Sequence, residues 1–265
     1  MTAIDADALG TALERLRARV PLVQSITNIV AAQWTANVLL AAGAVPAMVD
    51  NPHEAGEFAR VADGVLINLG TPYDDTTDAM QAAVRAATEA GRPWVLDPVA
   101  AGGLTWRTDT ALRLLGHGPA IVRGNASEIL ALAGGKGGRG VETIDTPEGA
   151  SEMAQELAHQ HGCVVAVSGP VDHLGDGERL VRLANGHPWL TQVTGVGCAL
   201  GALMAGFAGV LDDRLLAAAG ATALLTVAAE LAAEQARGPG TFAVVLLDEL
   251  ARLAPEELAE RVRLL

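Results

Sequence analysis

The feature that most constrains the fold is an alternation of short apolar runs with longer amphipathic stretches. The apolar runs, bounded by the turn formers Gly, Pro, Asp or Asn, predict buried strands at residues 45–49, 65–69, 95–96, 121–122 and 164–167. Helical patterns lie between them, at residues 29–40, 76–90, 108–115, 126–132 and 147–161. Because alternating strands and helices form βαβ crossovers, the pattern predicts a mostly parallel sheet covered on both faces.

The C-terminal third has a different pattern. After Gly197 nearly every stretch is helical, over residues 198–211, 213–236, 240–253 and 255–265, while residues 171–186 predict a strand hairpin. The apolar run 198–211 is too short to cross a bilayer. The alanine-rich helix 215–233 is expected in the core rather than at a subunit face. Since no repeat or long linker divides the chain, a single α/β domain over residues 1–265 is predicted.

The charge balance excludes several classes of function. The chain has 18 basic and 31 acidic residues, a net charge of −13, and Lys136 is its single lysine. No basic stripe suited to duplex nucleic acid is present. A phosphate-binding Walker A loop is excluded because Lys136 is followed by Gly137 rather than Ser or Thr. A lysine Schiff base is disfavoured because residues 134–140 form a solvated Gly-rich run.

Cysteine and histidine usage favours a reducing compartment and no zinc. Cys163 and Cys198 are too few for a disulfide framework, and the six histidines show no zinc-site spacing. Asp5 and Asp7 stand where a signal peptide would be basic and then apolar. A cytoplasmic location is therefore expected.

Polar residues directly follow several predicted strands, where open α/β sheets bind their ligands. Asp97 closes one strand, and Arg123 beside another strand end could clamp phosphate. Asn125 and Glu128 lie three residues apart at a helix start. They could converge on a hydrated Mg²⁺, or they could form an ordinary capping box, and the sequence leaves both open.

A Gly-rich turn, residues 194–197, opens directly into an apolar helix. The free N–H groups of such a helix start form a cradle for a phosphate oxygen, although a simple tight turn would leave the same pattern. Cys198 falls in the first helical turn. The helix end would lower the pKa of its thiol, whereas burial would raise it, so the direction stays open.

Three further segments, residues 24–28, 46–48 and 68–71, each place a small polar or amide group beside an apolar run. Met48 suits a flexible apolar wall against a flat ring. This mixture fits a pocket for a neutral heterocycle. Strand-end turns and a core methionine would explain each segment equally well.

Taken in order, these pieces resemble the hydroxyethylthiazole kinase family, a thiamine-salvage branch of the ribokinase-like superfamily. The resemblance is carried by residues 25–48, 67–71, 95–102, 122–129, 194–203 and 237–242. It spans about residues 21–242 and implies a three-layer α/β/α fold with a mostly parallel central sheet and a helical C-terminal third. It also implies ATP- and Mg²⁺-dependent phosphorylation of the hydroxyl of 4-methyl-5-(2-hydroxyethyl)thiazole.

The resemblance also assigns roles by position. It implies catalysis by Cys198, where most ribokinase-like enzymes have an aspartate base, with Gly195 and Gly197 as an anion hole. The remaining implied contacts are ATP at Arg123, Ser168 and Asn125, metal at Asp97 and Glu128, and substrate at Met48, Asn28 and Gly195. Members of the family are homotrimers with the active site between neighbouring subunits.

Two departures and three alternatives accompany this resemblance. Ala100 stands where the family usually has glycine, so its Cβ could crowd the phosphate region, and residues 50–53 also differ. The alternatives are a ribokinase-like kinase for another small alcohol such as a pyrimidine, an ATP-dependent dehydratase that repairs hydrated nicotinamide cofactors, and a non-catalytic ligand-binding protein. Cys198 favours the thiazole enzyme, because aspartate is expected there in the dehydratase.

Overall fold

A computed structural model describes residues 4–134 and 147–265, so Lys136 lies outside the described residues. Its helices are α1 Ala6–Arg19, α2 Ala32–Ala42, α3 Ala55–Val61, α4 Asp74–Glu89, α5 Thr105–Leu115, α6 Ala126–Ala133, α7 Pro147–His161, α8 Val196–Val210, α9 Arg214–Gln235, α10 Pro239–Arg252 and α11 Pro255–Arg261, with a 3-10 turn η2 at Pro188–Gln192. Its strands are β1 Leu22–Ile26, β2 Val45–Ala47, β3 Gly64–Asn68, β4 Trp94–Asp97, β5 Ile121–Asn125, β6 Val164–Ser168, β7 Asp172–Gly175 and β8 Leu180–Leu183.

The strands of the described residues form one eight-stranded sheet in the order β2-β1-β3-β4-β5-β6-β7-β8. Neighbours from β2 to β6 are parallel, whereas β6–β7 and β7–β8 are antiparallel. The mostly parallel sheet and the hairpin predicted for residues 171–186 are therefore both confirmed.

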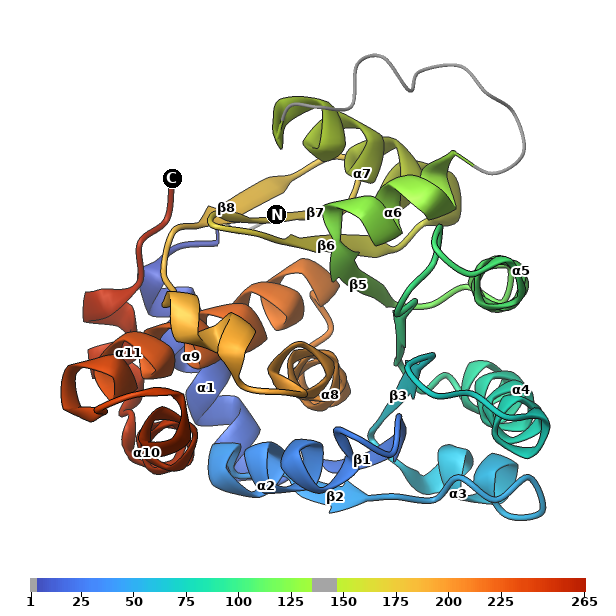
Figure 1. Cartoon of the computed structure of the whole chain (residues 1–265), viewed down its shortest axis with the longest axis horizontal. Helices are drawn as coiled ribbons and strands as arrows, with labels where there is room; N and C mark the ends of the chain where they lie inside the picture. The colour runs from blue at the N-terminus through green and yellow to red at the C-terminus, as the bar shows by residue number, and fades with distance from the viewer. Residues whose placement is uncertain (1–3, 135–146) are drawn as a thin grey trace.

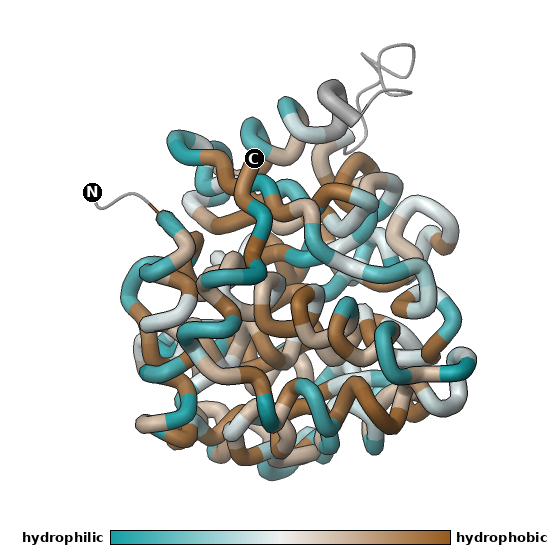
Figure 2. The backbone as a smooth tube through the Cα atoms, turned by 90° about the vertical axis from the view of Figure 1, so that its left-hand side faces the viewer, coloured by the Kyte–Doolittle hydropathy of each residue, from teal (hydrophilic) through white to brown (hydrophobic). Residues whose placement is uncertain are grey.

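Helices cover both faces of the sheet, which gives three layers (Figure 1). Helices α3 to α7 pack on one face, and α1, α2 and α8 to α11 pack on the other. Strand side chains alternate between the layers: Leu66 packs with the α8–α9 side, and Val65 and Ile67 pack with the α4 side. In Figure 2 hydrophobic stretches run through the interior, and hydrophilic segments lie mostly toward the periphery.

Helix α8 lies unusually close to strand β3. A Cβ on Gly64 would collide with the carbonyl oxygen of Ala205, and a Cβ on Gly209 would stand 2.8 Å from the carbonyl oxygen of Asp63. Glycine is therefore required on both the strand and the helix for this contact. The approach fixes the position of α8 relative to the sheet.

The C-terminal third is helical, as expected, and α9 is its core. Among the described residues the longest helix is α9. Its sequence is not one uninterrupted apolar run, because Gly220, two threonines and two glutamates lie among its apolar residues. By length and composition it could span a membrane, but 89% of its most apolar stretch is buried inside the protein. The prediction that residues 215–233 form a core helix is confirmed.

Other elements differ from the prediction. Helices α1 and α3 and strand β1 were not expected, and α2 begins at Ala32 instead of residue 29. In β1, Gln24 is polar but fully buried, because its Nε2 donates to the carbonyl oxygens of Val49 (2.9 Å) and Ala55 (3.1 Å). These two tertiary hydrogen bonds allow a polar residue to occupy a buried strand position where the sequence pattern would require an apolar one.

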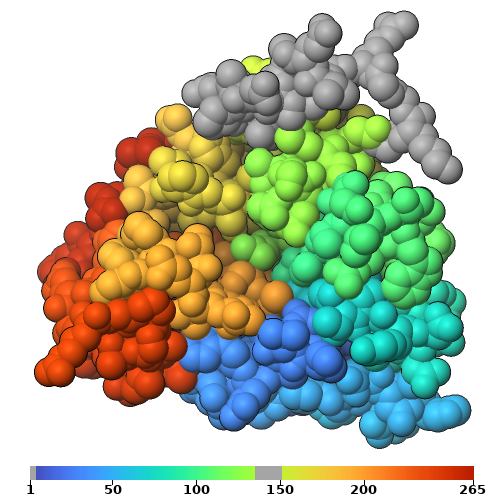
Figure 3. All heavy atoms as spheres, viewed as in Figure 1, coloured from blue at the N-terminus to red at the C-terminus, as the bar shows by residue number. Residues whose placement is uncertain are grey.

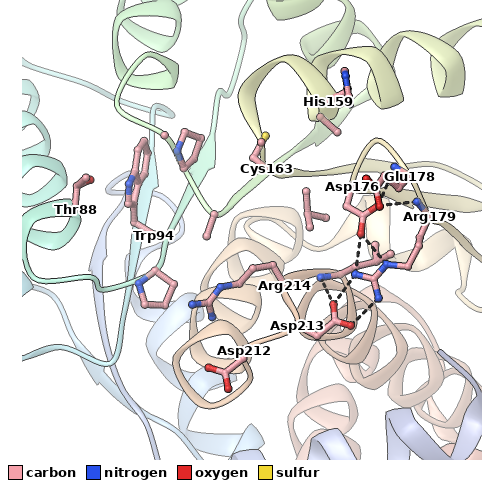
Figure 4. A pocket seen from close by; sticks show the side chains of 18 of the residues that line it. Thr88, Trp94, His159, Cys163, Asp176, Glu178, Arg179, Asp212, Asp213 and Arg214 are labelled. Carbon is pink, nitrogen blue, oxygen red and sulfur yellow. Dashed lines mark hydrogen bonds and ion pairs between the residues drawn. The ribbon is translucent and has the colours of Figure 1, made fainter. Parts of the chain in front are cut away.

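A cavity of about 690 Å³ opens near the amino ends of β4, β5 and β6, and none of the predicted site residues lines it (Figure 4). Arg179 spans one wall and pairs with Asp176 (2.7 Å) and Asp213 (2.7 Å). Cys163 lies buried at another wall, and burial raises the pKa of its thiol to about 12. The cavity is separate from the sheet edge where the predicted site residues gather.

Candidate active site

The predicted site residues gather at the carboxyl edge of the parallel strands. The register aligns Asn68 with Asp97 across β3–β4, and Asn125 with Ser168 across β5–β6. Parallel strands end at the same edge of a sheet, so their terminal side chains face one region. In Figure 3 the surface is hollowed at the centre of the view, between the yellow-to-orange, green and blue segments of the chain.

Asp97 is a fully buried carboxylate at the end of β4. Its Oδ2 accepts a hydrogen bond from Asn68 Nδ2 (2.7 Å) and lies 3.6 Å from Arg123 Nη1, while Oδ1 has no hydrogen-bond partner. Burial raises the pKa of Asp97 to about 6, opposed by the charge of Arg123 and reinforced by that of Glu128. The carboxylate therefore has one oxygen available for a further ligand.

Arg123 connects the strand ends to the start of α8. Its Nη2 donates to Ser168 Oγ (3.1 Å), and its buried Nε has no partner. A Cβ on Gly197 would lie 2.9 Å from Arg123 Nη1, so the guanidinium rests directly against this glycine. The arrangement points a fixed cation at the first turn of α8.

Asn125 and Glu128 form the capping box that the sequence left as one alternative. Asn125 Oδ1 accepts from the Glu128 backbone N–H (3.0 Å), and Glu128 Oε2 accepts from the Asn125 N–H (2.9 Å). Glu128 Oε1 also accepts from the N–H of Ala100 (3.0 Å). Ala100 has a φ of +64°, the left-handed region that favours glycine, so its Cβ strains the loop after β4.

The start of α8 has no side-chain cap. Gly195 is the N-cap with a φ of +84°, and its carbonyl oxygen accepts the first intrahelical bond from Ala199 N–H (2.9 Å). The amides of Val196, Gly197 and Cys198 therefore have no intrahelical partner. Free N–H groups at the positive end of a 15-residue helix form an anion cradle.

Cys198 lies in this first turn, partly buried, and its Sγ accepts a hydrogen bond from Asn28 Nδ2 (3.2 Å). Burial raises the pKa of its thiol, and the negative charge of Asp97 adds to the rise. Hydrogen bonds from Asn28 and Asn68 and the charge of Arg123 act in the opposite direction. Of the two directions left open by the sequence, the structure favours the raised pKa, with burial as the largest cause.

Met48 lies apart from this cluster. It follows β2, the edge strand, whose Ala47 pairs with Gln24 of β1, and its side chain is 38% exposed. Asn28, in contrast, is 5% exposed and contacts Cys198 directly. Within a single subunit, the predicted substrate residue Asn28 therefore contacts the thiol. Met48, also predicted to bind substrate, lies at the exposed margin of the sheet.

Sequence analysis missed Asp172. This buried carboxylate accepts a hydrogen bond from the Gly169 N–H (3.1 Å), just beyond the end of β6. Burial raises its pKa to about 6, and the positive charge of Arg123 opposes that rise. The available signal was an acidic residue four positions beyond the end of one strand, β6, and at the start of the next, β7.

The comparisons with known proteins decide between the alternatives. The model of the hydroxyethylthiazole kinase family matches residues 13–256. The chain belongs to this family. The family's hydroxyethylthiazole kinase from Cutibacterium acnes is 57% identical over 255 residues, covering 96% of this chain and 92% of that protein.

Solved structures agree that the chain belongs to the hydroxyethylthiazole kinase family. The structure of the hydroxyethylthiazole kinase protein from Pyrococcus horikoshii OT3 superposes with a TM-score of 0.90 at 40% identity, covering 97% of this chain and 98% of that one. A ribokinase-like superfamily protein from Enterococcus faecalis V583 matches with a TM-score of 0.64 at 14% identity, covering 95% and 96% of the two chains. This second likeness supports the fold alone, and the ribokinase-like three-layer prediction is confirmed.

Proposed function

We propose that this chain transfers the γ-phosphoryl group of ATP to the hydroxyl of 4-methyl-5-(2-hydroxyethyl)thiazole, in thiamine salvage. The observation that carries the proposal is the meeting of Arg123 with the uncapped start of α8: Gly197 has no Cβ, and Arg123 Nη1 occupies the space beside it. Membership of the hydroxyethylthiazole kinase family supplies the reaction class.

In this proposal ATP lies across the carboxyl ends of the strands. Arg123, Ser168 and Asn125 contact the nucleotide, and the backbone of Gly195 and Gly197 binds the phosphoryl group as charge develops on it. The net charge of −13 does not oppose binding of a polyanion, because a guanidinium and a helix terminus set the local field.

The donor set fits magnesium as the metal that accompanies ATP. Among the described residues, no group of three or more His, Cys, Asp and Glu side chains could hold an ion by itself. Mg²⁺ typically uses one or two carboxylates and completes its shell with water and phosphate oxygens. Asp97, with its unpartnered Oδ1, and Glu128 would hold such an ion, which would neutralise charge on the phosphates.

Cys198, Asn28, Gly195 and Met48 form the proposed substrate side. Even an unperturbed thiol pKa of about 8.5 leaves roughly a tenth of the group ionised at pH 7.5, and the pKa of Cys198 is raised. Cys198 therefore orients the alcohol in most molecules. Only its ionised fraction can accept the proton of the alcohol; where Cys198 is neutral, the proton passes to an oxygen of the transferred phosphoryl group or to water. The Asn28 amide, donating to Sγ, holds the sulfur in place for this contact.

We also propose a single domain over residues 1–265, a cytoplasmic location and a homotrimer with active sites between subunits. Exposed apolar side chains near α2 and β2 support the oligomer: Ile29, Val30, Leu40, Val45 and Met48. A neighbouring subunit would bring such a margin into contact with substrate. Native mass spectrometry measures the subunit number.

The function is tested by ADP release with a panel of small alcohols. We expect release with the thiazole alcohol only, and no turnover after Mg²⁺ is chelated, because the phosphates would then be only partly neutralised. A pyrimidine alcohol as the preferred substrate would support the related kinase. ATP hydrolysis linked to hydrated nicotinamide would support the dehydratase, and no ADP with any compound would support a binding protein.

Replacing Cys198 separates the two roles open to it. Cys198→Ala is expected to lower kcat by about tenfold, because the alcohol loses its contact and its proton acceptor. Cys198→Asp is expected to keep or raise kcat, since a carboxylate is ionised at neutral pH. Steady-state kinetics of both variants provide the measurement, and a Cys198→Ala variant as fast as the parent would refute the assignment.

A further inference from the structure

Asn68, at the end of β3, is 1% exposed, and its amide is hydrogen-bonded within the protein. The orientation of its amide is fixed at both ends. Its Oδ1 accepts from the backbone N–H of Gly70 (3.0 Å), a group that can only donate. Its Nδ2 donates to Asp97 Oδ2 (2.7 Å), and an ionised carboxylate can only accept.

The amide of Asn28 is oriented by the same logic. Its Oδ1 accepts from the backbone N–H of Ala31 (2.9 Å), so its Nδ2 must face the other way. That nitrogen has two protons, of which one is donated to Asn68 Oδ1 (2.9 Å) and the other to Cys198 Sγ (3.2 Å). If Asn68 Oδ1 were removed, the Asn28 amide would lose the acceptor of one of its two protons and with it one of the bonds that hold its rotation.

We propose that Asn68 is a positioning residue for Cys198, acting through Asn28 and through its own amide. The four side chains form one directed chain of hydrogen bonds, in which Asp97 orients Asn68, Asn68 orients Asn28, and Asn28 donates to the sulfur. The amide of Asn68 also hydrogen-bonds the sulfur, so two oriented amides act on the thiol. The chain joins the carboxylate proposed for the metal to the thiol proposed for the alcohol.

This arrangement has a chemical consequence at the sulfur. Because the Asn28 amide donates, the sulfur lone pair on that side is occupied and the S–H bond points elsewhere. The donated bond also favours the thiolate over the thiol. Asn68 therefore controls both the direction of the S–H bond and the reactivity of Cys198 without touching substrate.

The test combines kinetics with the rate at which iodoacetamide alkylates Cys198. For Asn68→Ala we expect kcat to fall about tenfold, both KM values to stay within about threefold, and alkylation of Cys198 to slow by about threefold. Asn185→Ala is the matched control. Asn185 is also a buried amide, whose Nδ2 donates to Glu230 Oε2 (3.0 Å) and whose Oδ1 accepts from the Arg263 N–H (2.6 Å), but it lies outside the candidate site, so kcat and alkylation of Cys198 should match the parent.

The buried Cys163 reports on folding in the same experiment, because its thiol is alkylated only if the protein opens. If Cys163 becomes reactive in Asn68→Ala, the Asn28→Ala variant is used instead of Asn68→Ala. Asn28→Ala should slow alkylation of Cys198 by the same factor. The proposal would be overturned if Cys198 were alkylated at the parental rate in a variant of Asn68 or Asn28 whose Cys163 stays unreactive.

A double-mutant cycle distinguishes positioning from a general structural role. In a Cys198→Ala background, Asn68→Ala should change kcat by less than about twofold, because its effect passes through the sulfur. Independent, additive losses would overturn the proposal. The inference rests on the proposed role of Cys198: a fully active Cys198→Ala would refute that role, whereas the alkylation rates test Asn68 independently of turnover.

Discussion

Asp97→Asn is expected to lower kcat by about 1000-fold. The substitution keeps the size of the side chain and an oxygen that can accept from Asn68 Nδ2, but it removes the charge next to Arg123 and the proposed metal ligand. Loss of one preorganised electrostatic contact in a phosphoryl-transfer site typically lowers kcat by about 100- to 1000-fold. This variant loses two contacts, the charge next to Arg123 and the proposed metal ligand. Turnover measured at saturating ATP and Mg²⁺ checks the expectation.

The same variant is expected to stabilise the fold at neutral pH. Burial raises the pKa of Asp97 from 3.8 to about 6, so between these values the folded state binds more protons than the unfolded state. Stability therefore falls as pH rises through this window, by up to about 3 kcal/mol for a pKa change of roughly 2. The uncharged Asn side chain avoids this cost, and the pKa of about 6 already includes the opposing attraction of Arg123.

Thermal unfolding at several pH values measures this effect. The stability gain of Asp97→Asn should be largest above pH 7 and should shrink as pH falls below about 6. Asp176→Asn is the control of opposite sign. Hydrogen bonds from the Arg179 and Glu178 backbone and from the Arg179 side chain hold the pKa of Asp176 below its usual value, so its removal should destabilise at neutral pH. Destabilisation by Asp97→Asn at every pH would contradict the account.

Arg123→Met is expected to lower kcat/KM for ATP by about 1000-fold, because the fixed cation beside the start of α8 is lost. Arg123→Lys should recover at most about tenfold. A lysine keeps the charge but cannot occupy both the position near Asp97 and the one near Ser168.

Arg113→Met provides the matched control for Arg123. Arg113 is an exposed arginine that also donates to a side-chain hydroxyl, Thr110 Oγ1 (2.8 Å), but it lies on α5, so its removal should leave kcat/KM within about twofold. Initial rates over a range of ATP concentrations give the comparison. If the Arg123→Met variant bound ATP as tightly as the parent, the nucleotide would have to bind at a different position.

The parts of the fold predicted correctly are those whose pattern depends on local sequence. The strand at residues 65–69 was recognisable because its side chains face apolar layers on both sides. Strand β1 was not, because Gln24 and Ser25 break its apolar run and are buried by contacts that only the folded chain supplies. Helix α3, seven residues long, is too short to show a helical period.

The candidate site divides in the same way. Asp97, Arg123 and Ser168 were proposed because each follows a predicted apolar run, and the fold does bring these strand ends to one edge of the sheet. The positioning role proposed for Asn68 was not predicted, since it depends on the direction of an amide between two distant segments. Glu128 Oε2 accepts from the Asn125 N–H in the capping box, and Oε1 accepts from the Ala100 N–H. The metal proposed at Glu128 would use the lone pairs that these two hydrogen bonds leave free.

The close contact between α8 and β3 has an evolutionary consequence. Gly64 and Gly209 leave no space for even a methyl group, so the helix cannot slide along the sheet to accommodate a different ligand. The start of α8, where we propose that the phosphoryl group binds, is therefore held in one position relative to the sheet. In this proposal a preference for a new alcohol would have to arise in the segments that follow β1, β2 and β3, where side chains can be exchanged without moving the backbone of α8.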